Sequence, residues 1–221
     1  MREVNAVIFD MDGVLVDSEG FWQEAEYEVF SALGVQLSDE LCLQTRAMTT
    51  SEVAQFWYKR NPWEDIPLEE VEQKVISSVI NRIQQQPCAI EGVLSFVEHL
   101  KQNGFKVGLA TNSPYGIIPP VLEKVGVKDL FDAISSADEV QEGKPDPAIY
   151  LLTAEKLGVS PEKCIAIEDS ASGARAAHLA GMKVVGYNHL GQYPSIEKAD
   201  YHLQSFYSAL SLFPHLPQSH S

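Results

Sequence analysis

Two aspartates separated by one residue follow the first apolar segment of the chain, in the tetrapeptide Asp10-Met11-Asp12-Gly13. The apolar residues 5–9 are typical of a buried strand, and the glycine allows the chain to turn afterwards. At such a strand end one carboxylate can attack phosphorus, while the other protonates the leaving alcohol and later deprotonates water. Taken alone, the tetrapeptide fits a solvated acidic turn equally well.

A second polar segment begins at Thr111, which ends the apolar residues 106–111 and is followed by Asn112, Ser113 and Pro114. This order is typical of the start of a helix. A hydroxyl and unpaired backbone amides at a helix start can bind phosphate oxygens without any positive charge. The simpler alternative is that these residues only cap the helix.

A third segment supplies a cation. Lys144 stands between Gly143 and Pro145, and because proline restricts the backbone, the sequence predicts a rigidly held ammonium group. A fixed ammonium can keep Asp10 ionised and offset the charge of a phosphoryl group in transfer. The alternative is an ordinary loop lysine at a helix start.

A fourth segment adds two acids. Glu168 and Asp169 directly follow the apolar residues 164–167. Mg²⁺ prefers oxygen ligands, so Asp10, the Asp12 carbonyl oxygen and Asp169 would form a suitable set. The role of Glu168, as a direct ligand or through water, stays open, and capping of the next helix is the alternative for this pair.

The elements around these segments alternate between strand and helix. The apolar and helical periodicities predict strands over residues 5–9, 106–111, 133–136, 164–167 and 183–187, and helices over 93–102, up to about 126, 147–157 and 171–180. Such alternation favours an α/β fold with a doubly wound parallel sheet. The polar segments then lie at one edge of the sheet, where ligands bind in this architecture.

A helical block separates the first strand from the others. Helical periodicity covers residues 21–33, and further helices are predicted to begin near Thr50 and near Pro67. We therefore expect an α/β core made of residues 1–15 and 89–213 with a helical cap, residues 16–88, inserted into it. The tail, residues 214–221, lacks periodicity and is expected to be frayed.

Composition restricts the partners. Asp and Glu total 31 against 16 Lys and Arg, for a formal net charge of −15, so the average surface repels nucleic acid and anionic lipid. The apolar runs are far shorter than the ~18 residues of a membrane span, and three widely spaced cysteines favour a reducing compartment. These features predict a cytoplasmic protein without nucleic-acid or membrane partners, and the four polar segments predict a small phosphorylated metabolite as its ligand.

The polar segments also carry a family resemblance. They resemble, in order and spacing, the four motifs of the haloacid dehalogenase superfamily, and the helical insertion resembles the C1 cap of its β-phosphoglucomutase-like branch. The residues that carry the resemblance are Asp10-x-Asp12-Gly13, Thr111, Lys144 and Glu168-Asp169. The resemblance implies a Rossmann-like core, a capped site and phosphoric monoester hydrolysis.

Roles follow from the resemblance residue by residue. It implies that Asp10 is the nucleophile that forms an aspartyl phosphate and that Asp12 is the general acid and base. It further implies that Thr111 and the Asn112 amide bind phosphoryl oxygens and that Lys144 pairs with their charge.

The resemblance also implies a metal site. Asp10, the Asp12 carbonyl oxygen and Asp169 are its expected Mg²⁺ ligands.

Within this branch, residues 17–19 followed by Trp22, and the aromatic residues 56–58, look most like small-sugar phosphatases that act on hexitol phosphates or on hexose 6-phosphates such as 2-deoxyglucose 6-phosphate. The mutases of the branch usually carry histidine where this chain has Trp22, which favours hydrolysis. Packing inside the cap is the simpler explanation of Trp22. A sugar phosphomutase, and a phosphatase for another metabolite such as phosphoglycolate, are the alternative functions.

The cap loop departs from the family pattern. Many relatives carry Gly-x-x-Arg where this chain reads Ala47-Met48-Thr49-Thr50, so threonine replaces the expected arginine. Arginine would bind a second phosphate or carboxylate through two hydrogen bonds, so its absence favours a neutral sugar moiety. Arg46 lies three residues earlier, and the sequence leaves open whether it reaches the cleft.

Two non-enzymatic alternatives use similar residues. A signalling receiver domain also combines a phosphorylated Asp with Thr or Ser, Lys and an acidic pair, but its acidic pair follows the first strand and its accepting Asp lies mid-chain. A degenerate binding module would lack at least one of the four polar segments, whereas this chain has them all.

Overall fold

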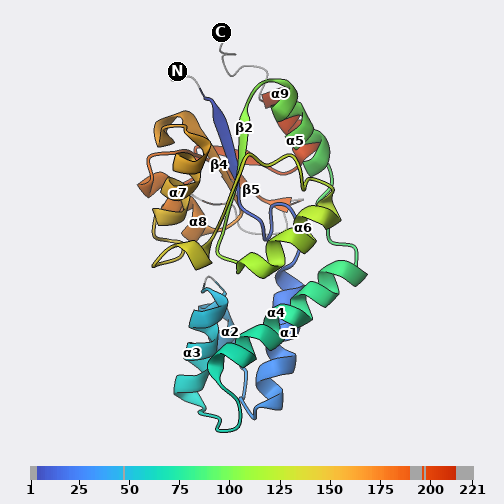
Figure 1. The fold of residues 1–221 in the computed structure, drawn as a ribbon, viewed down its shortest axis with the longest axis vertical. Coiled ribbons are helices and arrows are strands. Elements are labelled where there is room, and N and C mark those ends of the chain that lie inside the picture. The colour runs from blue at the N-terminus through green and yellow to red at the C-terminus, as the bar shows by residue number, and fades with distance from the viewer. Residues whose placement is uncertain (1–3, 47, 190–195, 197, 213–221) are drawn as a thin grey trace.

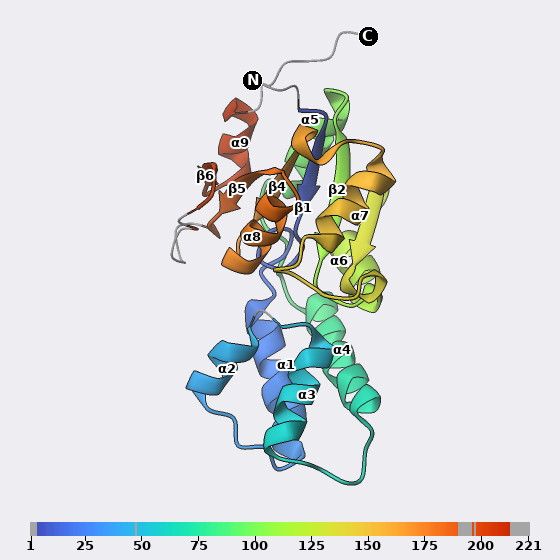
Figure 2. The ribbon, with the colours of Figure 1, turned by 90° about the vertical axis from the view of Figure 1, so that its left-hand side faces the viewer.

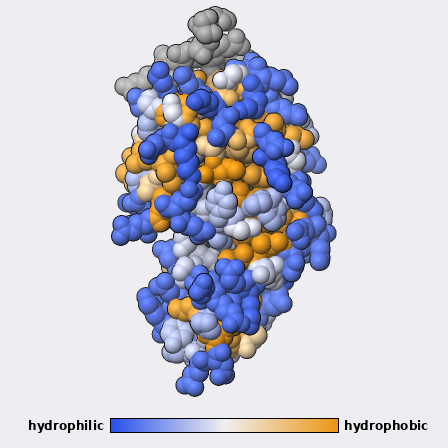
Figure 3. Space-filling view, viewed as in Figure 1, coloured by the Kyte–Doolittle hydropathy of each residue, from blue (hydrophilic) through white to orange (hydrophobic). Residues whose placement is uncertain are grey.

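A computed structural model describes residues 4–46, 48–189, 196 and 198–212 of the chain. Over these ranges the chain forms an α/β core with a block of helices at one end (Figures 1 and 2). Polar residues cover most of the face in Figure 3, and hydrophobic patches lie over the core and near its junction with the helical block. No helix in the described ranges is long and apolar enough to cross a membrane.

The core is built on a parallel sheet. Within the described residues six strands pair in the order β3-β2-β1-β4-β5-β6, and all of the pairings are parallel. The strands are β1 (Ala6–Phe9), β2 (Lys106–Thr111), β3 (Ala133–Ser136), β4 (Cys164–Glu168), β5 (Lys183–Tyr187) and β6 (Tyr201–Leu203). Because β1 lies between β2 and β4, the residue that follows β1 lies at the middle of the C-terminal edge.

Helices cover both faces of the sheet (Figure 1), with α5, α6 and α9 on one face and α7 and α8 on the other. These helices are α5 (Val93–Gln102), α6 (Ile118–Val125), α7 (Ala148–Leu157), α8 (Ala171–Leu179) and α9 (Phe206–Leu212). Short 3-10 turns precede α6, follow β3 and precede β4, at Tyr115–Ile117, Ala137–Glu139 and Pro161–Lys163. The predicted α/β class and doubly wound parallel sheet are confirmed.

Alternating side chains of β1 supply both halves of the core. Val7 and Phe9 are fully buried in the cluster beneath α5 and α9, whereas Ala6 and Ile8 belong to the cluster beneath α7 and α8. A strand buried on both faces reads as a continuous apolar run, which is why the sequence pattern located it.

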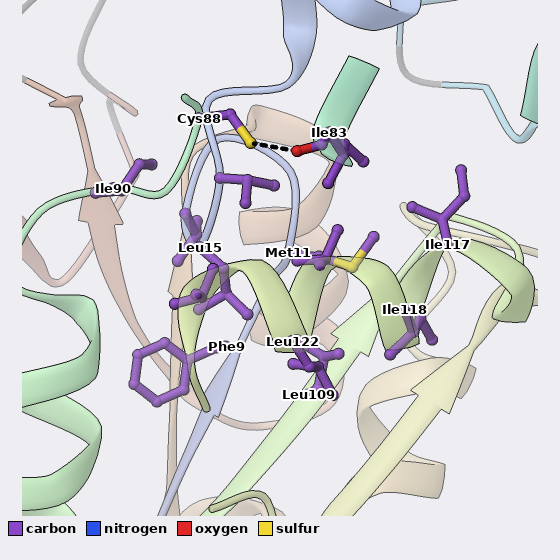
Figure 4. Close-up of a cluster of buried hydrophobic side chains, with 14 of the residues drawn as sticks. Phe9, Met11, Leu15, Ile83, Cys88, Ile90, Leu109, Ile117, Ile118 and Leu122 are labelled. Carbon is purple, nitrogen blue, oxygen red and sulfur yellow. Dashed lines mark hydrogen bonds between the residues drawn. The ribbon is translucent and has the colours of Figure 1, made fainter. Parts of the chain in front are cut away.

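The turn after β1 is anchored by apolar contacts on one side. Met11 and Leu15 are fully buried and point toward Ile118 and Leu122 of α6 (Figure 4). This packing fixes the backbone around the two aspartates, because a well-packed apolar side chain has little freedom to shift.

The helical block is a bundle of α1 (Glu19–Ala32), α2 (Asp39–Thr45), α3 (Thr50–Arg60) and α4 (Leu68–Gln85). Its interior is aromatic: Phe30 packs against Trp57 and Trp63, with ring centroids 6.2 and 6.1 Å apart. The inserted helical cap is confirmed as an architecture, while its predicted boundaries, residues 16–88, stay a prediction. The predicted frayed tail lies outside the described residues.

The two segments that join block and core run side by side. Asp17 N donates to Cys88 O at 2.8 Å, Ile90 N donates to Leu15 O at 3.0 Å, and Val16 forms an isolated antiparallel bridge with Ala89. Backbone hydrogen bonds between the two connections restrict how the block can move relative to the core.

Candidate active site

Four polar segments meet at the C-terminal edge of the sheet, as the sequence predicts. Phe9 of β1 pairs in register with Leu109 of β2 and with Ile167 of β4. Asp10 therefore stands between the end of β2, at Thr111, and the end of β4. The Asp10 backbone amide donates to Ile167 O at 2.9 Å, which fixes the main chain at this point.

Asp10 is a buried acid beside a buried cation. It is 8% exposed, and its Oδ1 accepts a hydrogen bond from Lys144 Nζ at 2.7 Å. Burial, and next the negative charge of Glu168, raise the pKa of Asp10 to about 7, although Lys144 acts in the opposite direction. Burial and the charge of Glu168 together therefore outweigh the stabilisation that Lys144 gives to the ionised carboxylate.

Lys144 uses all three of its ammonium hydrogens. Nζ donates to Asp10 Oδ1 at 2.7 Å, to Ala110 O at 2.8 Å and to Glu168 Oε1 at 2.6 Å. Burial alone would lower the pKa of Lys144, but the charges of Asp10 and Glu168 outweigh burial and raise it. The lysine is therefore a fixed positive charge, in agreement with the expected rigid placement.

The side chain of Asn112 holds the backbone of the Lys144 loop. Asn112 Oδ1 accepts from Lys144 N at 2.8 Å, and Asn112 Nδ2 donates to Lys144 O at 3.3 Å. The sequence predicted only that the Asn112 amide binds phosphoryl oxygens, so this contact between two distant loops was missed. The nearby Thr111 is 1% exposed, and its Oγ1 accepts from Ser113 N at 3.0 Å.

Asp12 is held by three side-chain donors. Oδ1 accepts from Ser18 Oγ at 2.5 Å and from Trp22 Nε1 at 2.9 Å, and Oδ2 accepts from Ser113 Oγ at 2.6 Å. Ser18 and Trp22 lie at the start of α1, so the helical block contributes directly to the position of this carboxylate. Trp22 therefore does more than pack inside the cap.

Asp169 packs closely on the turn after β1. A β-carbon added to Gly13 would lie 2.0 Å from Asp169 Oδ2, and Gly13 has a φ of +75°. Both the backbone conformation and the close approach require glycine here, which extends the role expected from the sequence.

Three carboxylates converge at the ends of β1 and β4. The ligand oxygens of Asp10, Glu168 and Asp169 all lie within 4.8 Å of one another. Burial, and then the charges of Asp10 and Glu168, raise the pKa of Asp169 well above its ordinary value. An oxygen-only donor set with excess negative charge fits a hard divalent cation. This group contains Asp10 and Asp169 of the predicted ligand set, and Glu168 in addition.

The raised pKa of Asp10 predicts how stability depends on pH when no divalent metal is bound. The folded-state pKa, about 7, lies above the ordinary 3.8, so the folded chain binds this proton more tightly than the unfolded chain does. The resulting stabilisation is complete below about pH 4 and is lost as the pH rises through about 7.

Asp10→Asn removes this titration. In metal-free buffer we expect the variant to unfold at a higher temperature than the unmodified protein at about pH 8, with a difference that shrinks toward pH 4. Thermal unfolding followed by circular dichroism measures it. A variant that is the less stable of the two at the higher pH would contradict the raised pKa of Asp10.

The cap loop lies against the Lys144 loop. A β-carbon added to Gly143 would lie 3.0 Å from Thr49 Cγ2 and 2.8 Å from Asn112 Oδ1. Thr49 therefore approaches the site, but its hydroxyl also caps α3, because it accepts from Glu52 N while the Glu52 carboxylate accepts from Thr49 N. Residue 47, also in this loop, lies outside the described residues.

Arg46 has an acidic partner inside the cap. Its guanidinium forms an ion pair with Glu19, at the first turn of α1. Glu19 also accepts from Gln23 Nε2 at 3.0 Å. The charge of Arg46 is thus balanced within the cap.

Comparison with known proteins decides the family. A sequence model of the haloacid dehalogenase-like hydrolases matches residues 4–181. The chain belongs to this family. The predicted enzyme class, a phosphatase of this hydrolase family, is confirmed. Phosphatases of the family generally use a divalent metal, which agrees with the cluster of carboxylates.

Similar proteins span most of the chain. Hexitol phosphatase B of Escherichia coli (strain K12) is 39% identical over 185 residues, which are 83% of each chain. A phosphorylated carbohydrates phosphatase of Thermotoga maritima is 33% identical over 180 residues, which are 81% of this chain and 83% of that protein. The solved structure of a putative β-phosphoglucomutase from Thermotoga maritima has a TM-score of 0.74 and 30% identity, and the match covers 96% of this chain and 100% of that one.

Proposed function

We propose that this hydrolase is a Mg²⁺-dependent phosphatase of small phosphate monoesters, sugar phosphates such as hexose 6-phosphates in particular. The observation that carries the proposal is the position of the Asp10 carboxylate, which is buried, held by Lys144 at 2.7 Å and placed at the middle of the sheet edge. Asp10 takes the phosphoryl group and forms an aspartyl phosphate.

The first step depends on the charges around Asp10. Lys144 fixes one carboxylate oxygen through its 2.7 Å hydrogen bond, which leaves the other oxygen for attack on phosphorus. Thr111 and the backbone amide of Asn112 are proposed to donate to the phosphoryl oxygens. Asp10, the Asp12 carbonyl oxygen and Asp169 would hold Mg²⁺, which would supply positive charge to offset that of the phosphoryl group.

The second carboxylate moves protons in both steps. Asp12 protonates the leaving alcohol oxygen when the bond to phosphorus breaks, and it later deprotonates the water that hydrolyses the aspartyl phosphate. Its hydrogen bonds to Ser18, Trp22 and Ser113 support this role, because they aim both oxygens and restrain the side chain. The helical cap closes over the ester and excludes bulk water.

Two features support a sugar phosphate as the substrate. The relatives include a hexitol phosphatase and a phosphorylated carbohydrates phosphatase. In addition, the described part of the cap loop holds no cation whose charge is left unbalanced and could bind a second anion. Thr49 replaces the expected arginine, and Arg46 forms an ion pair with Glu19. Both features favour a neutral polyol beyond the ester oxygen.

A screen for phosphate release tests the proposal. The purified protein with Mg²⁺ is assayed against hexose 6-phosphates, hexitol phosphates, phosphoglycolate and nucleotides. We expect the highest kcat/KM for a sugar or hexitol phosphate. A preference for nucleotides or phosphoglycolate would contradict the proposed substrate class, and no phosphate release from any ester would contradict the function.

A phosphomutase is the second candidate, supported by the likeness to a putative β-phosphoglucomutase. Incubation with a hexose 1-phosphate separates the two functions, because a mutase returns the 6-phosphate isomer whereas a phosphatase releases free phosphate. We expect free phosphate.

Thr49→Arg is predicted to change substrate preference. An arginine at this position can bind a second anion through two hydrogen bonds, so we expect the ratio of kcat/KM for a sugar bisphosphate to that for the monophosphate to rise about tenfold. The substitution also removes the Thr49 hydroxyl that caps α3, at a cost of about 1 kcal/mol. Thr49→Val, which loses the cap without adding charge, is the matched control. An equal ratio in the arginine and valine variants would show that this position does not select the substrate.

A further inference from the structure

Tyr150 is a buried tyrosine next to the site and takes no part in the chemical steps of the proposed reaction. It lies in the first turn of α7, is fully buried, and donates from its hydroxyl to Glu168 Oε1 at 2.5 Å. Nothing in the sequence distinguishes it, since an aromatic residue at helical spacing is usually a core residue. Its hydroxyl, however, is directed at a carboxylate of the site.

The Glu168 carboxylate is fully buried and surrounded by donors. Oε1 accepts from Tyr150 and, at 2.6 Å, from Lys144 Nζ, while Oε2 accepts from Ser170 Oγ at 3.1 Å. A β-carbon added to Gly173 would lie 2.0 Å from Glu168 Oε1, so α8 closes the remaining side. A buried carboxylate needs such donors, because an unpaired buried charge is costly.

Lys144 connects this carboxylate to Asp10. Its ammonium donates to Glu168, to Ala110 O and to Asp10. The same ammonium lies 5.0 Å from the centroid of the Tyr150 ring. Tyr150 therefore touches both members of the Lys144–Glu168 ion pair, once through its hydroxyl and once through its ring.

A divalent cation would compete with Lys144 for the Glu168 carboxylate. Its carboxylate lies within 4.8 Å of ligand oxygens on Asp10 and Asp169, so a divalent cation in the site would attract it. In the present geometry the hydrogen bonds from Tyr150 and Lys144 hold Oε1. Without the tyrosine hydroxyl, Oε1 keeps a single donor and the balance shifts toward the metal position.

We propose that Tyr150 is a positioning residue for phosphoryl transfer: its hydroxyl holds Glu168 on Lys144, and this keeps Lys144 against Asp10. The proposal rests on the proposed function in one respect, namely that Asp10 is the nucleophile. It assigns different roles to the two acids at the end of β4. Asp169 would bind the metal, whereas Glu168 pairs with Lys144.

Tyr150→Phe tests the proposal, because it removes only the hydroxyl and keeps the ring under the ammonium. We expect kcat to fall about tenfold, with KM changed by less than about twofold. Tyr187→Phe is the matched control, since Tyr187 is also buried and its hydroxyl contacts His189 Nδ1 at 3.0 Å, outside the site. The control should retain kcat. Equal kcat values for the unmodified protein and the Tyr150 variant would overturn the proposal.

Metal binding and a double variant separate positioning from other effects. In titration calorimetry, the Tyr150→Phe protein should bind Mg²⁺ at least as tightly as the unmodified protein does. Weaker binding, with kcat restored by excess Mg²⁺, would show that the tyrosine acts through the metal and overturn the proposal. If Tyr150 acts through Glu168, then Tyr150→Phe should cost nothing further in a Glu168→Gln background. Additive losses would also overturn it.

Crystal structures of the unmodified protein and of Tyr150→Phe provide a test that does not require activity. We expect the Glu168 carboxylate to move away from Lys144 and the contact between Lys144 Nζ and Asp10 Oδ1, 2.7 Å in the present structure, to lengthen in the variant. An unchanged arrangement would overturn the proposal even for an active enzyme. Failure of the proposed function would instead appear as an unmodified protein that releases no phosphate.

Discussion

Asp10→Asn is expected to reduce kcat for hexose 6-phosphates on the order of 10⁴-fold or more, because it removes the proposed nucleophile of the first step. An amide nitrogen or oxygen at this place lacks the negative charge that attacks phosphorus. Asparagine nevertheless keeps the shape of a side chain that is 8% exposed, so the fold should persist. Steady-state phosphate release, with circular dichroism as the check on folding, measures the effect.

Two controls sharpen this expectation. Asp132→Asn changes an acid that pairs with Lys101 at 2.6 Å, away from the site, and should retain kcat. Asp12→Asn should also lose turnover, but by blocking proton transfer and not phosphoryl acceptance, so some phosphoenzyme can still form with an activated leaving group. Substantial turnover by folded Asp10→Asn protein would remove Asp10 from the role of nucleophile.

Removal of the divalent metal is expected to lower kcat strongly. Three carboxylates converge within 4.8 Å, and a phosphate ester would add further negative charge, which Lys144 alone does not balance. We expect exhaustive chelation to lower kcat about 10³-fold and added Mg²⁺ to restore it. Phosphate release before and after readdition of Mg²⁺ measures the effect.

Metal dependence can also be tested without activity. Mg²⁺ should raise the midpoint of thermal unfolding, because binding to the folded state alone stabilises it. The increase should be smaller in Asp169→Asn, which removes one of the clustered carboxylates. A fully active chelated enzyme, or an identical Mg²⁺ effect in both proteins, would show that the acids do not form the metal site.

The sequence predicted the site because its residues follow buried strands. Runs such as residues 6–9 and 164–167 are apolar throughout, so their ends could be located without knowledge of the fold. The C-terminal ends of parallel strands share one edge, and this places Asp10, Thr111 and Glu168 together. Lys144 could be associated with them only by motif, since a loop has no periodicity.

Contacts between side chains on different elements could not be predicted from the sequence. Trp22 donates to Asp12 over ten residues, and Ser18, which precedes α1, uses its hydroxyl for Asp12 and makes no side-chain cap. Tyr150 reads as a core aromatic because helical spacing reports burial and not the direction of a hydroxyl. Each of these contacts depends on the angle between two elements, which periodicity does not specify.

Three elements were not predicted, for related reasons. α2 spans seven residues, fewer than a clear helical period needs, although Ser38 provides its N-cap. β6 has three residues, of which Tyr201 and His202 are exposed, so no apolar run marks it. α9 follows β6 directly in a region with little periodicity, and Phe206 is fully buried against the sheet. All three elements depend on tertiary packing, which the local sequence pattern does not reveal.

The cap loop shows where the sequence argument about substrate was incomplete. The missing arginine at Thr49 was visible in the sequence, but the pairing of Arg46 with Glu19 was not. Both observations now point in the same direction, because neither residue leaves a free cation for a second anion. The proposed preference for a sugar monophosphate therefore rests on the local charge balance of the cap, and not on the net charge of the whole chain.

The proposed reaction passes through an aspartyl phosphate at Asp10, and this intermediate can be trapped. A hexose 6-phosphate with a radiolabelled phosphoryl group is mixed with enzyme and Mg²⁺, quenched in acid within milliseconds, and the protein is digested for peptide mapping. We expect a label that hydroxylamine removes, on the peptide that contains Asp10, and no label in Asp10→Asn. Release of phosphate without labelled protein, or with the label on a different residue, would show that Asp10 is not the nucleophile.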